Sequence, residues 1–201
     1  MFDLPKDCVV NKFIPKKTFY EKLNIATSIK DEFVDVVDKV TWLYKISADT
    51  FKSNKTENVE ELEIFQIDLK EKKIPKNVIK IISKAIPYKI LFVLKWNSEI
   101  CYSINAENNY YTEWNDDIVI EFKGFDLETI YQNIVKIIIK EQNNDNNFEK
   151  VIQDKTRKNV LEKQIDTLKN KIKSEKQFNK KVELNQELRK LENEMEELLN
   201  G

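Results

Sequence analysis

Apolar residues in the first two thirds of the chain follow the two-residue period of a β-strand or cluster in short runs. Five segments have such a pattern and are predicted to be strands: residues 40–47, 62–69, 89–96, 99–106 and 118–123. The third of them carries an almost uninterrupted apolar run, Ile90–Leu94. We therefore expect it to be central in a sheet and buried on both faces.

Helical spacing, with apolar residues three or four positions apart, appears between and after these strands. It predicts a short helix that starts at Pro15, a second that begins at Ser28, a third between Pro75 and Pro87, and a fourth whose N-terminus is capped by Asp126. Three further segments are predicted to be extended chain or loops: residues 1–12, 48–61 and 108–115. We assign residues 1–142 to one α+β domain, a mixed five-stranded sheet with flanking helices.

A short stretch rich in asparagine and glutamine follows this domain. Residues 143–148 are predicted to be a linker, because a segment of this composition cannot bury apolar surface. The remaining residues, 149–201, are rich in charge and contain neither proline nor, before Gly201, glycine. We expect this last part to form a charged helical hairpin or a coiled coil.

Two apolar seams run through the C-terminal segment. They consist of Leu161, Ile165, Leu168 and Ile172, and of Leu184, Leu188, Leu191, Met195 and Leu198. Spacings of three and four residues place each set on one side of a helix, where it can pack against another helix. The seams are out of phase, since 23 positions separate the first leucine of one from the first leucine of the other. The break falls near residues 174–181.

Charge separates the two halves of this segment and favours a hairpin. Residues 155–181 contain ten basic and three acidic residues, whereas residues 182–201 contain two basic and six acidic ones. A hairpin pairs these opposite charges, and an antiparallel homodimer does so equally well. One long helix with a stutter in its seam is the third alternative. The absence of glycine and proline at the turn counts against the hairpin, which is still the favoured form.

The composition removes several classes of enzyme. The chain has 201 residues, a net charge of −1, no histidine and two glycines. These counts exclude catalysis by histidine, histidine-ligated metals and glycine-rich phosphate loops. Two cysteines, Cys8 and Cys101, are too few for a closed zinc site. We expect no metal and no cofactor and, without an apolar leader or a membrane-spanning run, a cytoplasmic protein.

Two acid-x-Lys sequences at predicted strand ends resemble part of a magnesium-dependent nuclease site. They are Asp68 with Lys70, and Glu121 with Lys123. In such a site carboxylates hold Mg²⁺ and a lysine stabilises the charged transition state. Asp49 and Glu63 are the best candidates for the further acid that this chemistry needs. Because charged residues are common in this chain, solvent-facing strand ends explain the pattern more simply.

Basic residues of the C-terminal segment suggest a second alternative, contact with nucleic acid. The candidate contacts are Lys155, Arg157, Lys158, Lys169 and Lys173. Lysine and arginine side chains bind the phosphate backbone in such contacts. An acidic segment follows directly in the sequence, so a solvated helix face with its own acidic partner is the simpler interpretation.

Five segments of the chain resemble a known prokaryotic family. They are residues 10–17, 42–47, 63–69, 84–92 and 175–185. The most specific are Lys84-Ala-Ile-Pro-Tyr-Lys-Ile-Leu-Phe and Glu175-Lys-Gln-Phe-Asn-Lys-Lys-Val-Glu-Leu-Asn. On these motifs the chain resembles, over nearly its whole length, the family described as domain of unknown function 4391. The resemblance implies no established activity and no catalytic residues. It also implies genes that neighbour DNA methyltransferases and helicases of restriction or phage-defence type.

Together these patterns favour a non-enzymatic accessory or adaptor protein. We expect it to associate through its C-terminal helices with a protein partner or with a second copy. The resemblance places this role in a DNA restriction or phage-defence system. Enzymatic activity is the less favoured expectation, with nuclease chemistry and nucleic-acid binding as the alternatives.

Overall fold

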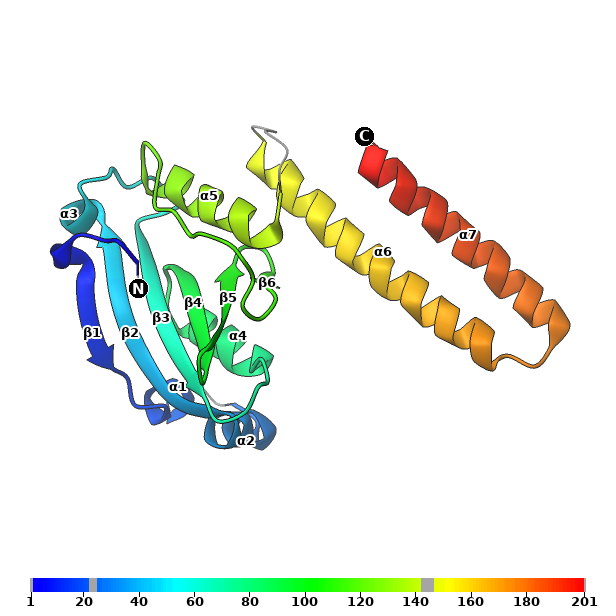
Figure 1. The fold of residues 1–201 in the computed structure, drawn as a ribbon, viewed down its shortest axis with the longest axis horizontal. Coiled ribbons are helices and arrows are strands. Elements are labelled where there is room, and N and C mark those ends of the chain that lie inside the picture. Colours follow the sequence, from blue (N-terminus) through cyan, green and yellow to red (C-terminus); the bar gives the residue numbers. More distant parts are fainter. Residues whose placement is uncertain (1, 22–24, 142–146, 201) are drawn as a thin grey trace. The chain divides into compact units, whose positions relative to one another are not determined.

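The chain folds into two units, seen in a computed structural model. The units are Met1–Asn143 and Asn144–Gly201. The structure describes residues 2–21, 25–141 and 147–200. A sheet with its helices forms the first unit, and two long helices form the second (Figure 1). Most of the predicted linker, residues 143–148, lies outside the described residues. No helix in the described ranges is long and apolar enough to cross a membrane.

The first unit is built on one six-stranded sheet, whose strands follow one another in chain order from edge to edge. The strands are β1 (Val9–Phe13), β2 (Val37–Ser47), β3 (Glu61–Leu69), β4 (Lys89–Trp96), β5 (Glu99–Asn105) and β6 (Asn109–Tyr111). Neighbouring strands are antiparallel except β3 and β4, which are parallel. Helix α4 (Lys76–Ala85) makes the crossover that a parallel pair requires. The predicted α+β class with a mixed sheet is confirmed.

The two parallel strands lie at the centre of the sheet and are buried on both faces. Phe65 of β3 and Phe92 of β4 belong to one apolar core, which also contains residues of α4. Ile64 and Leu91 alternate with these residues along the strands and are fully buried, so they face the opposite side. The apolar run Ile90–Leu94 therefore occupies the central position that its composition predicted.

The main helices of the first unit lie where the spacing of apolar residues predicted them. Helix α5 (Leu127–Ile139) contacts β3, β5 and β6. Its N-terminus is capped as expected, because Asp126 Oδ1 accepts a 2.8 Å hydrogen bond from the backbone N–H of Thr129. The other helices are η1 (Lys6–Cys8), α1 (Lys17–Glu21), α2 (Thr27–Asp35) and α3 (Ala48–Phe51). Phe19 of α1 and Phe33 of α2 join the core that contains α4.

The strand count differs from the prediction of five. Strands β1 and β6 form where extended chain and a loop were predicted, because each pairs with the edge of a longer strand. Residues 118–123 were wrongly predicted to be a strand and belong to no strand of the described sheet. Their side chains do alternate between half-buried and exposed. Phe122 packs on Phe2, with ring centroids 5.3 Å apart, instead of entering a ladder.

The second unit is a helical hairpin, the favoured alternative among those predicted. Helices α6 (Phe148–Ser174) and α7 (Phe178–Asn200) contact each other and run side by side in Figure 1. The turn between them falls within the predicted break. It needs no glycine, because none of its residues has a positive φ. Glu175 Oε1 accepts the backbone N–H groups of Lys176 and Gln177 at 2.7 and 2.8 Å. Hydrogen bonds from these backbone groups hold the pKa of Glu175 below its usual value.

Candidate association surface

The apolar seams of the two helices meet inside the hairpin. On α6, Leu161, Ile165 and Leu168 are buried. The remaining seam residues are half-buried: Ile172, Leu184, Leu188, Leu191, Met195 and Leu198. A pair of helices has no third element to close its sides. Part of the apolar stripe of α7 therefore stays in contact with water.

Ion pairs join the two helices on both sides of the seam. Arg157 Nη2 lies 2.8 Å from Glu194 Oε1, and Lys169 Nζ lies 3.1 Å from Glu192 Oε1. Helical periodicity places Arg157 and Lys169 on opposite flanks of the α6 seam. Basic α6 and acidic α7 thus pair as the charge pattern of the sequence predicted for a hairpin.

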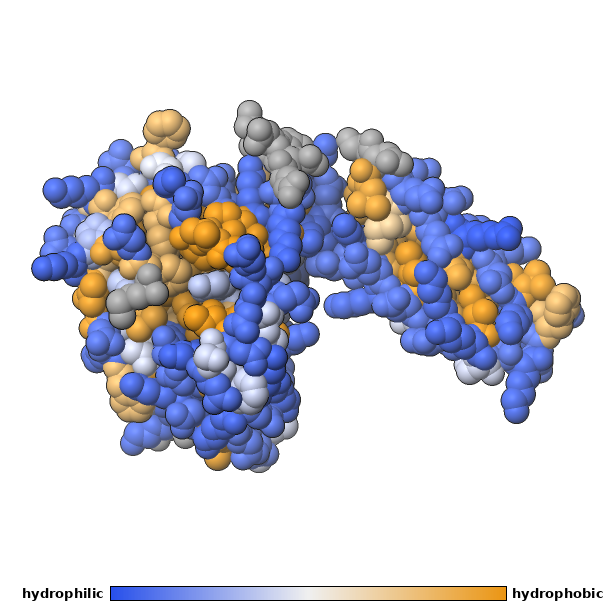
Figure 2. All heavy atoms as spheres, viewed as in Figure 1, coloured by the Kyte–Doolittle hydropathy of each residue, from blue (hydrophilic) through white to orange (hydrophobic). Residues whose placement is uncertain are grey.

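Apolar side chains remain visible along the hairpin. Figure 2 shows a hydrophobic stripe that runs between the hydrophilic side chains of the two helices. Leu199, next to the seam residue Leu198, is 60% exposed. Covering this stripe with another helix would remove apolar surface from water, at about 25 cal/mol for each Å². The hairpin therefore retains apolar surface that its own two helices do not cover.

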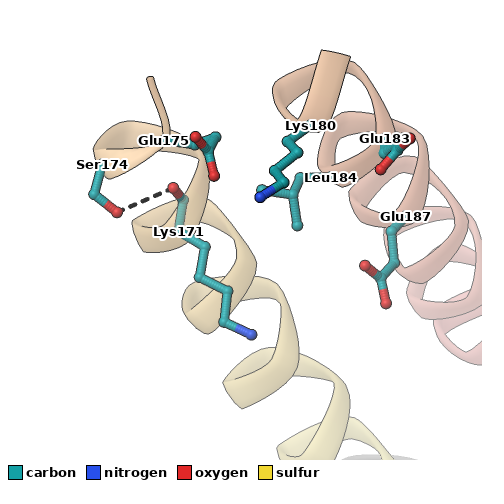
Figure 3. Close-up of a pocket in the computed structure, with 7 residues that line it drawn as sticks. All are labelled: Lys171, Ser174, Glu175, Lys180, Glu183, Leu184 and Glu187. Carbon is teal, nitrogen blue, oxygen red and sulfur yellow. Dashed lines mark hydrogen bonds between the residues drawn. The ribbon is translucent and has the colours of Figure 1, made fainter. Parts of the chain in front are cut away.

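The hairpin opens near its turn into a cleft of about 440 Å³ (Figure 3). Leu184 is its apolar residue. The other lining residues are Lys171, Ser174, Glu175, Lys180, Glu183 and Glu187. The Ser174 hydroxyl bonds back to its own helix, since its Oγ lies 3.1 Å from the Lys171 carbonyl oxygen. The cleft lining therefore combines one apolar side chain with charges of both signs.

The five basic residues proposed for nucleic-acid contact are not a uniform basic face. Arg157 and Lys169 are held in the ion pairs with α7. The other three are Lys155, Lys158 and Lys173, which helical spacing places on the same side of α6 as Lys169. Glu162 and Asp166 share that side, so the positive charge there is diluted. A phosphate backbone would also compete with carboxylates already paired to two of the five residues.

The acid-x-Lys residues do not converge on one site. Lys70 Nζ donates a 2.7 Å hydrogen bond to the carbonyl oxygen of Val34. Asp68, two residues earlier, is half-buried on β3. Glu121 and Lys123 form a solvent-exposed ion pair of 3.1 Å in the segment that is not a strand. Both lysines therefore already have partners other than a pair of metal-binding carboxylates.

The proposed additional acids lie away from Asp68. Glu63 precedes Asp68 by five positions on β3, so the two side chains point to opposite faces, about 16 Å apart along the strand. Asp49 is exposed on α3, which follows the end of β2 that pairs with the start of β3. Among the side chains that the structure describes, no group of three or more Asp, Glu, Cys or His residues is placed to hold a metal ion.

Glu63 belongs instead to a buried polar cluster on β2 and β3. It is 3% exposed, and Trp42 Nε1 donates a hydrogen bond to its carboxylate. Glu61 lies on the same face two residues earlier and forms a 2.7 Å ion pair with Lys45. Burial raises the pKa of Glu63 to about 7, and Glu61 adds to the rise, while Trp42 and Lys45 oppose it. This carboxyl group therefore changes protonation near neutral pH.

Sequence reasoning named Glu63 only as a nuclease acid and missed its partners Lys45 and Glu61. The available signal was an acid within a strand of mostly apolar residues, because a buried carboxyl needs a partner or a raised pKa. The Trp42 contact was harder to foresee. It depends on an irregularity in the pairing of β2 with β3 between Trp42 and Tyr44, which moves side chains between faces.

Together the sheet unit and the hairpin define the class, an α+β protein with an appended pair of helices. A family model described as Domain of unknown function (DUF4391) matches residues 2–195, and the chain belongs to this family. The match spans the first unit and nearly all of the hairpin, so the resemblance seen in the sequence motifs is confirmed. Neither the curated proteins nor the solved structures include a match to the chain.

Proposed function

We propose that this protein is a non-enzymatic accessory or adaptor protein that associates with another polypeptide through the hairpin. The observation that carries the proposal is the seam of α7. Its five apolar residues, from Leu184 to Leu198, stay half-buried although α6 packs against them. The first unit provides the folded scaffold that presents this surface.

Completing the burial of this seam supplies the driving force. Full burial of a leucine side chain contributes about 1.5–3 kcal/mol, and most of each seam side chain is already covered, so completing the burial of one contributes about 0.2–1 kcal/mol. Five such residues in a row add up to a favourable term that works against the entropic cost of association. The exposed ion pairs at the flanks contribute less affinity and mainly fix the orientation of the partner.

The setting that we propose is the cytoplasm, within a DNA restriction or phage-defence system. Cys8 and Cys101 are both free and buried, which fits a reducing compartment. The defence setting is supported by the family resemblance alone. It names a class of process and does not identify the partner.

Capture of the tagged full-length protein from its native host tests the proposal, with two variants on α7. Leu184→Ser removes the apolar residue of the cleft. Val182→Ser is the matched control, since Val182 is 41% exposed and lies on the opposite side of the same helix. Circular dichroism checks that both variants keep their helical content.

The wild type and Val182→Ser are expected to retain the same partner, identified by mass spectrometry. Leu184→Ser is expected to retain about tenfold less of it, because the variant loses the apolar side chain of the cleft. Equal retention by the two variants would contradict the proposal. So would the absence of any partner, or of a second copy, from the wild-type sample.

The two alternative functions stay predictions, because no observed contact favours either. Nuclease activity predicts Mg²⁺-dependent cleavage of DNA or RNA that is lost in Asp68→Asn or Glu121→Gln. Nucleic-acid binding by α6 predicts an affinity that falls steeply as the salt concentration rises. Binding that is independent of salt would remove the second alternative.

A further inference from the structure

The side of the hairpin that carries the cleft has a basic edge and an acidic edge, so two copies of it can pair opposite charges. Along this side, which we call the cleft face, α6 presents Arg157 and Lys171, which are 14 positions apart. Helix α7 presents Glu187 and Glu194, which are seven positions apart. Heptad spacing keeps each pair on one side of its helix. Two lysines interrupt the acidic side of α7: Lys180, which also lines the cleft, and Lys190, seven positions after the cleft residue Glu183.

Apolar residues run between these two charged rows. Leu184, Leu191 and Leu198 are seven positions apart on α7, so they also share one side of the helix. All three are half-buried. The cleft face thus has an apolar centre, a basic edge from α6 and an acidic edge from α7.

We infer that the partner of the cleft face is a second copy of this chain, whose hairpin packs face to face on the first to form a four-helix bundle. The inference rests on the proposed function, because it names the partner of the same surface. A face with one basic and one acidic edge needs a partner with the opposite order of charges. Rotation by a twofold axis supplies that order from an identical copy.

Two twofold arrangements stack one hairpin on another, and charge distinguishes them. When the axis runs parallel to the helices, each α6 lies against the α7 of the other copy, antiparallel to it, and both turns are at the same end. When the axis runs across the helices, α6 lies against α6 and α7 against α7, and the turns are at opposite ends. Only the first arrangement brings Arg157 and Lys171 close to the acidic residues of the other copy.

The bundle therefore has both turns at one end and every helix antiparallel to its neighbours. The second arrangement would place the basic edge of one α6, which carries Arg157 and Lys171, against the same edge of the other α6. Like charges that face each other across an interface are unfavourable, and their repulsion selects against wrong arrangements. Burial of the leucine row supplies affinity in either case, so the charges decide the geometry.

Light scattering and a distance measurement on the full-length chain test this inference together. Light scattering over a range of concentrations is expected to show a dimer. A spin label on Lys176→Cys, in the exposed turn, then reports the distance between the two turns. Cys8 and Cys101 are buried, so the unmodified chain serves as the labelling blank. Lys163→Cys, near the middle of α6, is the matched control, because its distance differs little between the two arrangements.

Turns at the same end are expected to give a label distance of roughly 20 Å, set by neighbouring helices 8–10 Å apart and the label arms. Turns at opposite ends would give about 40 Å, the length of the 27-residue α6 at 1.5 Å per residue. A dimer with the longer distance would overturn the inference. A strict monomer would overturn it as well. The proposed function would still stand if a different partner bound the wild-type chain and was lost in Leu184→Ser.

Charge reversal gives an independent check on the pairing. Lys171→Glu and Glu187→Lys each place like charges together in the bundle and are expected to raise the dissociation constant of the dimer about tenfold. An equimolar mixture of the two variants is expected to recover most of the lost affinity, because each copy then supplies the charge that the other lacks. The proposed pairing would be contradicted if the mixture did not recover affinity. It would also be contradicted if the outward control Lys163→Glu raised the dissociation constant equally.

Discussion

Arg157 on α6 and Glu194 on α7 are 37 residues apart in the sequence and 2.8 Å apart in the hairpin. Their side chains are 60% and 38% exposed, so water and salt screen the pair. An exposed pair of this kind contributes about 0.2–1 kcal/mol to stability. Its larger effect is on specificity, since it fixes which side of α6 meets which side of α7.

Reversal of either charge of this pair is expected to destabilise the hairpin slightly. Arg157→Glu and Glu194→Arg should each lower the free energy of unfolding by about 0.5–1 kcal/mol, because each puts two like charges in contact. The double variant should regain most of the loss. A double-mutant cycle by urea denaturation measures the coupling. A double variant as unstable as the sum of the single ones would show that the two side chains do not interact.

Shortening a seam side chain is expected to lower the stability of the hairpin more than shortening a side chain next to the seam. Leu161 is 3% exposed and its neighbour Val160 is 49% exposed. Leu161→Ala should destabilise the hairpin by about 2–3 kcal/mol through the cavity that it leaves, whereas Val160→Ala should change stability by less than about 0.5 kcal/mol. Thermal unfolding followed by the helical circular dichroism signal compares them. Equal effects would mean that the seam is not the packed side of α6.

The hairpin could be predicted from the sequence because its signals are local. Leucine spacing, the out-of-phase seams and the change of charge all lie within one stretch of chain, and each depends only on helical periodicity. The sheet edges could not be predicted in the same way. Asn109–Tyr111 becomes a strand only because β5 offers it an open edge. Residues 118–123 have strand-like alternation but find no such edge, which the sequence does not reveal.

The candidate surfaces show the same difference between features that follow from local sequence and features that depend on strand pairing. The seam residues follow from spacing alone. The residues of the nuclease hypothesis do not lie together in the sheet, because an acid-x-Lys sequence says nothing about which carboxylates meet across strands. Glu63 and Asp68 are close in sequence, yet an odd separation on β3 puts them on opposite faces. The contact between Glu63 and Trp42 arises from strand pairing and its irregularity, so it was visible only in the structure.

The buried carboxyl of Glu63 is expected to make stability depend on pH. Its pKa is about 7 in the folded protein, against 4.5 without the protein environment. Between these values the folded state keeps a proton that the unfolded chain releases, so the free energy of unfolding falls as pH rises. The stabilising effect of the protonated form is complete below pH 4.5 and is lost as pH rises through 7. Each unit of pKa elevation corresponds to about 1.4 kcal/mol.

Glu63→Gln isolates this effect, because the amide stays neutral at every pH. Urea denaturation from pH 4.5 to 8 should show a shallower loss of stability for this variant than for the wild type. Glu107→Gln, at an exposed position, is the matched control and should leave the pH profile unchanged. A Glu63→Gln profile that superimposes on the wild-type profile would mean that the pKa of Glu63 is not raised in the folded protein.

The N-terminal cap of α5 provides a test of the first unit. Asp126 accepts hydrogen bonds from the backbone N–H and the hydroxyl of Thr129, and these lower its pKa. Asp126→Ala should destabilise the protein by about 0.5–2 kcal/mol, whereas Asp126→Asn, which keeps a capping oxygen, should cost much less. Guanidinium denaturation distinguishes the two variants. Equal losses would point to the charge of Asp126, rather than its capping bond, as the stabilising feature.

Hydrogen–deuterium exchange of the full-length protein tests the central claim most directly, because it shows where association buries surface. The comparison is between the dilute free protein and its assembled state, with a second copy or with the captured partner. Peptides covering residues 184–198 are predicted to exchange about tenfold more slowly on assembly, while those of β3 and β4 stay unchanged. Protection gained only in the first unit, with α7 unchanged, would contradict the assignment of the hairpin as the association surface.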